Sequence, residues 1–307
     1  MISSFFSKAK PIHFVIVCLI LLLSFSAAKF YTITTTINLG LILKEIGLFL
    51  VCLSTVFILD FLASRNNLTK KNSYKILIFS LFVAILPETI LNSNLLLSNL
   101  FILLAIRRII SLRSNKDIKK KLFDAAFWIS IATLFYFWAI LFYALIFIGL
   151  ILYRIVDIKN YIVPFIGILT VAILSSSYMI LTNQDLLSYF NNLIEFSFDF
   201  SSLNSQRIVI SSTIILTYGI WSLLYFIRYL KSKSKKSRPS FLLLIFSAII
   251  GLAIVVISPN KNGSEFIFLF APLSIIITNY LETISEKWFK EGLLLGLVIT
   301  PIVILML

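Results

Sequence analysis

The sequence has few of the residues on which most soluble enzymes depend. Charged residues make up 13% of the 307 positions, and there are only one histidine, His13, and two cysteines, Cys18 and Cys52. A single histidine excludes a histidine-based metal site or catalytic triad. Both cysteines lie inside apolar runs, so neither a disulfide framework nor a metal site is expected. No glycine-rich phosphate loop is present, and we predict neither ATP-driven chemistry nor a bound cofactor.

What the chain has in abundance is apolar side chains. Hydrophobic residues account for 60% of the sequence and the mean hydropathy is +1.03, far outside the range of soluble domains. These residues form repeated runs of about 15 to 22, a length that crosses a bilayer as a helix, whereas barrel strands are short and alternating. The sequence therefore predicts an all-α fold, a polytopic transmembrane helical bundle forming a single integral membrane domain over residues 1–307.

The breaks between apolar runs predict about 11 spans. They lie near residues 12–29, 42–63, 76–90, 95–110, 123–137, 138–153, 161–181, 208–228, 240–258, 265–281 and 292–306.

The distribution of basic residues predicts the orientation of these spans. With the N-terminus inside, 23 of the 27 lysines and arginines fall in cytoplasmic segments, leaving four on the opposite side: Lys29, Lys44, Arg207 and Lys261. Because cytoplasmic loops of membrane proteins are enriched in basic residues, this pattern predicts the N-terminus in and the C-terminus out. The net charge of +14 then reflects orientation, so no nucleic-acid partner is expected. We expect a multi-pass protein of the bacterial inner membrane, in contact with its lipids.

Two segments allow alternative interpretations. The run from Leu122 to Tyr153 is too long for one span of a bilayer core of roughly 30 Å, and basic residues flank both its ends. We therefore predict two short helices that meet near Phe137 and Trp138, the alternative being one steeply tilted helix. The first apolar run also fits a signal peptide, but the multispan sequence that follows favours an uncleaved first helix.

Residues 182–207 form the largest predicted outer loop. Leu186, Leu187 and Phe190 recur at helical spacing opposite polar residues, and Phe196, Phe198 and Phe200 then alternate with polar residues at period two. Such a segment fits an interfacial anchor, with its rings among acyl chains. The alternative is a lid over an amphiphilic substrate. Its candidate substrate-binding residues are Asp185, Glu195, Asp199 and Arg207.

Ionisable residues within or beside predicted spans are candidates for function because their burial is costly. Glu88 follows Pro87, which interrupts the third span. Asn92 and Asn94 add polar groups in the next turn and are candidate substrate-binding residues. Broken helices at membrane depth occur mainly where they line a cavity. Glu88 and Glu45 are therefore the candidate catalytic residues. A solvated helix end for Glu88, and an interfacial ion pair of Glu45 with Lys44, are the structural alternatives.

Further charged residues cluster at the two predicted membrane surfaces. Glu265 is a candidate substrate-binding residue at the outer side. On the inner side, Arg107, Arg108 and Arg113 are candidates for binding the phosphate of an anionic lipid, although such a cluster also serves simply as an orientation signal. Asp60 and Asp124 are expected to form ion pairs with this basic layer.

Two resemblances add to this interpretation. The opening MISSFFSKAKPIHF, the segment from LLLSNLFILLAIRRIISL to IFIGLILYR, and YIVPFIGIL resemble a family of uncharacterised polytopic membrane proteins of the Bacteroidota, a domain of unknown function. More distantly, a short outer turn followed by a basic cytoplasmic stretch and two short helices resembles the core of the C-superfamily of membrane glycosyltransferases. That resemblance implies a polyprenyl-phosphate-linked substrate at the outer face. The glycosyltransferases carry an acidic residue in their first outer loop, whereas residues 30–43 here have none, so Glu45 would have to replace it.

We therefore expect the protein to handle a lipid-linked or amphiphilic substrate at the outer face, as a glycosyltransferase-like enzyme or an inactive relative. The alternative is a non-catalytic subunit or scaffold of an envelope complex, with a membrane protein partner. A transporter is a third possibility, although no inverted repeat or deep pair of charges supports it.

Overall fold

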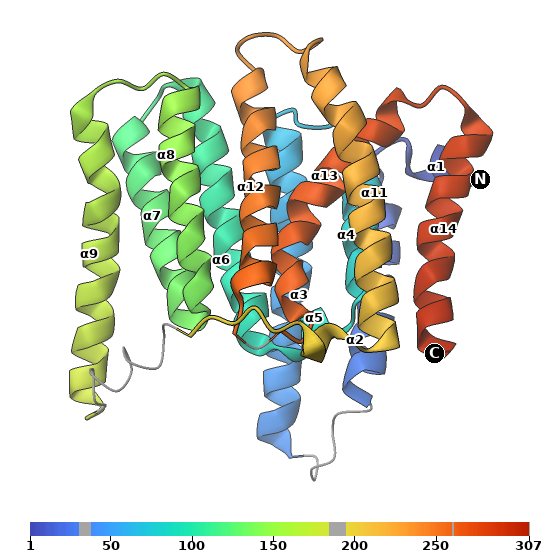
Figure 1. Cartoon of the computed structure of the whole chain (residues 1–307), viewed down its shortest axis with the longest axis horizontal. Helices are drawn as coiled ribbons and strands as arrows, with labels where there is room; N and C mark the ends of the chain where they lie inside the picture. Colours follow the sequence, from blue (N-terminus) through green and yellow to red (C-terminus); the bar gives the residue numbers. More distant parts are fainter. Residues whose placement is uncertain (31–37, 184–194, 260, 307) are drawn as a thin grey trace.

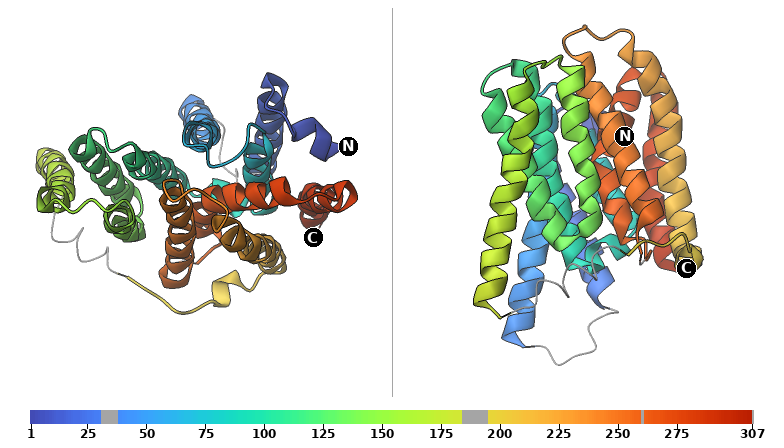
Figure 2. Two further views of the ribbon diagram at one scale, coloured as in Figure 1. Left: turned by 90° about the horizontal axis from the view of Figure 1, so that it is seen from above. Right: turned by 60° about the vertical axis from the view of Figure 1, so that its left-hand side comes forward.

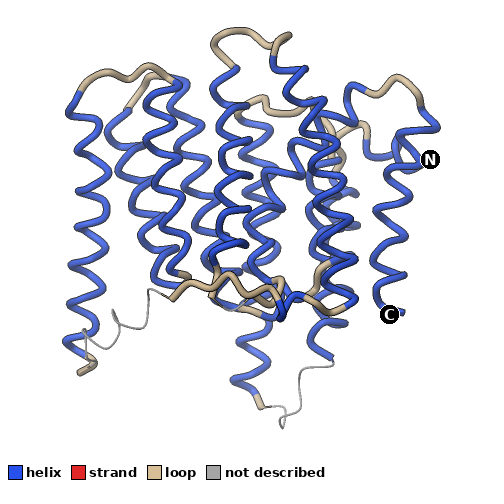
Figure 3. Tube along the Cα trace, viewed as in Figure 1, coloured by secondary structure: helices blue, strands red, loops and turns tan. Residues whose placement is uncertain are grey.

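The structure is a computed structural model that describes residues 1–30, 38–183, 195–259 and 261–306, and this part of the chain is a bundle of helices joined by short connections, without strands (Figures 1 and 3). The α-helices of the first half are α1 (Ile2–Phe6), α2 (Pro11–Phe30), α3 (Leu39–Arg65), α4 (Tyr74–Ile85), α5 (Glu88–Leu91), α6 (Ser93–Ile110) and α7 (Ile118–Phe135). Those of the second half are α8 (Tyr143–Leu152), α9 (Ile158–Leu181), α11 (Gln206–Leu230), α12 (Arg238–Ile257), α13 (Ile267–Thr283) and α14 (Lys287–Met306). The 3-10 helices are η1 (Ser111–Ser114), η2 (Phe137–Phe142), η3 (Ser201–Leu203) and η4 (Ser264–Phe266).

A helix occupies each predicted apolar run, which confirms the all-α fold class. In the described residues, eight helical segments are long and apolar enough to cross a membrane, so the chain has the character of a multi-pass membrane protein. The other three runs do not meet these limits: α4 has 12 residues, Phe137–Leu152 is short, and the first turns of α7 carry three lysines. Helices therefore occupy every predicted position, whereas the number of about 11 crossings stays a prediction.

The long run from Leu122 to Tyr153 forms two helices, as predicted. Helix α7 ends at Phe135, Tyr136 adopts an extended backbone conformation, and η2 and α8 continue the chain. Tyr143 fastens the second helix to the first, because its hydroxyl donates a hydrogen bond to the carbonyl of Ala126 at 3.1 Å. The single tilted helix is thus excluded.

The core of the bundle is formed around α13. Nearly all its side chains are buried, and it packs against α4, α11 and α12. Seen from above, α2 and α11 lie on opposite sides of α13, and α14 lies next to the C-terminal end of α13 (Figure 2). In contrast, α9 packs on α7 through Gly167, and Phe165, Ile166 and Leu169 are exposed. Exposed apolar faces of this kind suit contact with lipid chains.

The two ends of the bundle differ in charge. Figure 1 shows the connections 111–117, 153–157 and 231–237 at one end, which we call the basic end. The α4–α5–α6 turn and residues 195–205 and 258–263 lie at the other, which we call the distal end. At the basic end, ion pairs join Asp60 to Lys75 and Asp124 to Arg108, each at 2.8 Å. The ion pairs predicted for both aspartates are therefore confirmed.

Candidate functional site

The predicted interruption of the third span is present and is stabilised by a neighbouring helix. Helix α4 ends at Ile85 and α5 begins at Glu88, with Pro87 between them. Because proline has no backbone N–H and the chain changes direction here, the regular helical hydrogen bonds are interrupted. The hydroxyl of Ser211 on α11 donates to the carbonyl of Ile85 at 2.7 Å, and Thr89 N–H donates to the carbonyl of Leu86 at 3.2 Å. The backbone carbonyls at the break thus have hydrogen-bond partners.

This break opens onto a cavity of about 470 Å³ at the distal end. Its walls are mostly apolar and come from α2, α4 and α14, with Ala27, Leu81 and Ile302 among them. Two charged residues, Glu88 from α5 and Arg207 from the first turn of α11, also line the cavity. We call this space the Glu88 cavity. It therefore combines a hydrocarbon-like wall with a local pair of opposite charges.

The two charges of the Glu88 cavity remain available to a ligand. Glu88 is half-buried and Arg207 is exposed, and no ion pair joins the two described side chains.

Glu265 belongs to a separate polar cluster at the distal end. Its side chain is buried and accepts a hydrogen bond from the hydroxyl of Ser258 at 3.1 Å. Ser258 in turn accepts one from the hydroxyl of Tyr136 at 2.9 Å. This chain of bonds connects the start of η4, the end of α12 and the turn between α7 and η2. Glu265 therefore has a structural environment of its own and does not line the Glu88 cavity.

Lys261 holds the described part of the predicted outer loop against the bundle. Its side chain is 1% exposed, and its ammonium group donates to the carbonyls of Ser258, at 2.8 Å, and of Ser197. The same ammonium lies 4.7 Å from the centre of the Phe200 ring. Elsewhere in the loop, the Trp138 indole donates to the carbonyl of Glu195 at 3.1 Å. Residues 195–205 are thus fastened at several points.

The aromatic tail of this loop faces outward. Phe196, Phe198 and Phe200 are 62%, 64% and 46% exposed, on a segment without regular secondary structure. Asp199 closes a local turn by accepting hydrogen bonds from the backbone and hydroxyl of Ser201, both at 2.9 Å. Asp185 and the helix predicted around it lie outside the described residues. The exposed rings fit the anchor interpretation, and residues 195–205 do not line the Glu88 cavity.

The remaining predicted residues of the distal end have local partners. Helix α3 begins at Leu39, so Glu45 lies inside the helix, where it pairs with Lys29 of α2 at 3.0 Å and not with Lys44. The side chain of Asn92 caps α6 by accepting from the N–H groups of Asn94 and Leu95. Asn94 itself is exposed. Of the described residues predicted to act on substrate, Glu88 and Arg207 are the two that the structure brings into one cavity.

The three arginines predicted to bind phosphate have different environments at the basic end. Arg107 stacks over the Phe61 ring, 4.5 Å from its centre, and Arg108 pairs with Asp124. Arg113 lines a cavity together with Arg65, Lys121 and Lys236. No local sequence pattern places Arg65, Lys121 and Lys236 in one site, because they come from separate elements and only the fold brings them together.

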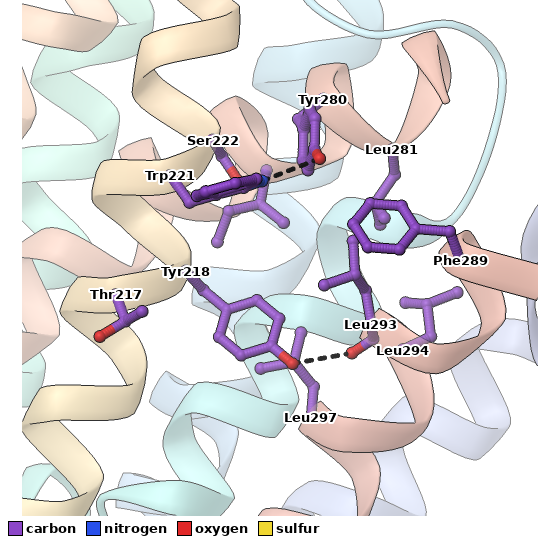
Figure 4. A pocket seen from close by; sticks show the side chains of 11 residues that line it. Thr217, Tyr218, Trp221, Ser222, Tyr280, Leu281, Phe289, Leu293, Leu294 and Leu297 are labelled. Atoms are coloured by element: carbon purple, nitrogen blue, oxygen red, sulfur yellow. Dashed lines mark hydrogen bonds between the residues drawn. The ribbon is translucent and has the colours of Figure 1, made fainter. Parts of the chain in front are cut away.

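Sequence analysis also missed an aromatic pocket between α11, α13 and α14 (Figure 4). It has a volume of about 250 Å³. Trp221 donates to the hydroxyl of Tyr280 at 2.8 Å, and Tyr218 donates to the carbonyl of Leu293 at 3.2 Å. Tyr218 also occupies the space beside Gly296, where an added Cβ would lie 2.7 Å from its hydroxyl. Packing against Tyr218 therefore accounts for the absence of a side chain at Gly296.

Comparison with known proteins identifies a family but no activity. No curated protein and no solved structure matches the chain. The predicted link to the Bacteroidota and the resemblance to glycosyltransferases stay predictions. A family model described as "Family of unknown function (DUF6427)" matches residues 1–306. Because that model covers nearly the whole chain, the protein belongs to the DUF6427 family.

Proposed function

We propose that this protein binds a lipid-linked or otherwise amphiphilic molecule in the Glu88 cavity. The observation that carries the proposal is the combination, in one cavity of about 470 Å³, of apolar walls with the side chains of Glu88 and Arg207. Sites for small molecules typically combine apolar linings with a few polar groups that fix orientation. Here the apolar walls receive a hydrocarbon chain, and the two charges receive its polar head.

Each side chain has a distinct role in this proposal. The Arg207 guanidinium offers the paired donors that suit a phosphate or carboxylate. The Glu88 carboxylate accepts a hydrogen bond from a hydroxyl of the bound head group. Because Glu88 is half-buried, these interactions are less screened than at an open surface.

The proposal includes an orientation. The excess of lysine and arginine at the basic end favours placing that end in the cytoplasm, with the N-terminus in and the C-terminus out. The helices at all 11 predicted positions then cross the bilayer, the shorter ones where it is locally thin or shielded by protein. The Glu88 cavity opens at the outer leaflet of the bacterial inner membrane, and its ligand enters from that leaflet.

In its enzymatic form, the proposal is transfer of a sugar from a polyprenyl phosphate. Glu88 takes the proton from the acceptor hydroxyl as that oxygen attacks the sugar, and the bond between sugar and phosphate breaks. Glu45 is paired with Lys29 and is absent from the cavity lining, so the proton transfer is assigned to Glu88 alone. Without a suitable acceptor, the protein binds the lipid-linked molecule but does not transfer the sugar, as an inactive relative of such enzymes.

Native mass spectrometry of the gently solubilised protein tests this proposal. We expect a discrete amphiphile adduct on the wild type that is weakened in Glu88→Gln and in Arg207→Gln. Glu286→Gln is the matched control, since Glu286 is exposed and lies just before α14. An adduct that is unchanged in both cavity variants would refute the proposal. A bound protein partner together with only bulk phospholipid would instead favour a scaffold subunit.

A further inference from the structure

The cavity at the basic end is lined by four cations and by no carboxylate. It has a volume of about 380 Å³. Arg65 ends α3, Arg113 lies in η1, Lys121 lies in the first turn of α7, and Lys236 belongs to the connection between α11 and α12. Its neutral polar lining comes from Asn66, Ser111 and Ser114. Four positive charges from four elements thus face one space.

Two of these cations are held in place by neutral groups. Arg113 donates to the carbonyl of Asn66 at 3.2 Å. Lys121 donates to the carbonyl of Ser111 at 2.9 Å and to the hydroxyl of Ser114 at 2.6 Å. Both side chains are half-buried, whereas Arg65 and Lys236 are exposed at the rim. The hydrogen bonds orient the charges without neutralising them, since carbonyls and hydroxyls carry no net charge.

The backbone between η1 and α7 explains this convergence. Asn115 and Asp117 both have positive φ, 53° and 49°, a conformation that asparagine and aspartate tolerate better than most residues. The chain therefore reverses within a few residues, which brings Lys121 back to the serines of η1. Asp117 influences Lys121 electrostatically but does not line the cavity.

Two neighbouring arginines at this end have side-chain partners within the chain. Arg108 is paired with Asp124, and Arg107 stacks on Phe61. Neither lines the cavity. Grouped cations without acidic partners repel one another and attract anions. A cavity lined by four cations and no carboxylate therefore favours the binding of an anion.

We infer that this cavity is a binding site for a phosphate group. Arginine and lysine donors converging from several directions match the tetrahedral array of phosphate oxygens, and a planar guanidinium contributes two parallel donors. The site lies where two apolar helices, α3 and α7, reach their basic ends, which is the depth of lipid headgroups. The phosphate belongs either to an anionic lipid or to a small soluble ligand. This inference is independent of the Glu88 cavity, which is at the other end of the bundle.

The test uses the full chain and two probes. In the first arm, the protein is placed in nanodiscs of phosphatidylcholine and phosphatidylglycerol, and retained phosphatidylglycerol is counted by native mass spectrometry. In the second arm, inorganic phosphate is titrated into detergent-solubilised protein by calorimetry. Retention of phosphatidylglycerol identifies a lipid headgroup as the source, and saturable binding of inorganic phosphate identifies a soluble ligand. Either result supports the site.

The variants separate a built site from general charge. Arg113→Gln combined with Lys121→Gln is expected to weaken binding by about tenfold or more, because two charge-assisted hydrogen bonds are lost. The control is Lys119→Gln combined with Lys120→Gln, which removes two exposed charges from the same turn. If the first pair disturbs folding, Arg65→Gln with Lys236→Gln replaces it, since both side chains are exposed. Equal loss in control and test variants, or no binding in either arm, overturns the inference.

Discussion

Replacing Lys261 by methionine should loosen the loop of residues 195–205 without unfolding the bundle. The ammonium of Lys261 donates to the carbonyls of Ser197 and Ser258 and lies over the Phe200 ring. Methionine keeps most of the apolar stem and removes only the charged donor. The loop would then lose the bridge that the ammonium makes from the Ser197 carbonyl to the Ser258 carbonyl, while the buried contacts of α13 stay intact.

The magnitude follows from the contacts that are lost. A hydrogen bond from a charged donor contributes about 1.5–3 kcal/mol, and a cation over an aromatic ring about 0.5–2 kcal/mol. Against this, methionine avoids the cost of holding an ammonium away from water, which is several kcal/mol. A net loss on the order of 2 kcal/mol remains. At about 1.4 kcal/mol per factor of ten, the loop opens roughly 30-fold more often.

Hydrogen exchange of the loop amides measures this opening. In the folded state the Ser197 N–H donates to the carbonyl of Ile257 at 3.3 Å, and the Asp199 N–H donates to the Ser197 hydroxyl at 3.0 Å. Both amides should exchange faster in Lys261→Met. Lys44→Met, at an exposed position of α3, should leave them unchanged. Exchange that differs less than twofold between Lys261→Met and the wild type would refute the reasoning.

Two further predictions concern packing between helices. Ser211→Ala removes the donor to the Ile85 carbonyl at the break and should lower the free energy of unfolding by about 1–3 kcal/mol, as measured by denaturant titration in detergent. The control is Ser212→Ala, because the Ser212 hydroxyl donates within its own helix. Equal effects of the two substitutions would count against the role of Ser211. Gly167→Leu should separate α9 from α7, because even a Cβ would lie 2.8 Å from that of Ala126. The same titration should show a loss of about 1–3 kcal/mol or more in the free energy of unfolding, because the added side chain overpacks the contact. Gly47→Leu is the control and should be tolerated, since there is open space around Gly47. A Gly167→Leu protein as stable as the wild type would contradict the close contact.

The candidate site shows where reasoning from sequence ends. Pro87 and Glu88 are adjacent in the chain, so the broken helix and its carboxylate could be found from local pattern alone. Arg207 could be named only as an outer charge, because its place in the same cavity depends on how α11 packs on α13 and α14. Glu45 was paired with the wrong lysine for the same reason: Lys44 is next to it in sequence, but successive residues of a helix point in different directions. Its partner, Lys29, comes from the preceding helix.

By itself the sequence determined the class of protein, the positions of the helices, the hairpin between α7 and α8, and the ends that carry the charge. These properties follow from hydropathy, from helix length and from proline, which act over a few turns of one chain segment. Only the tertiary structure decided which charges share a cavity, that Lys261 fastens the loop, and that Arg113 and Lys121 converge while Arg107 and Arg108 do not. Burial and electrostatic pairing depend on distances across helices, and those distances are set by packing around α13.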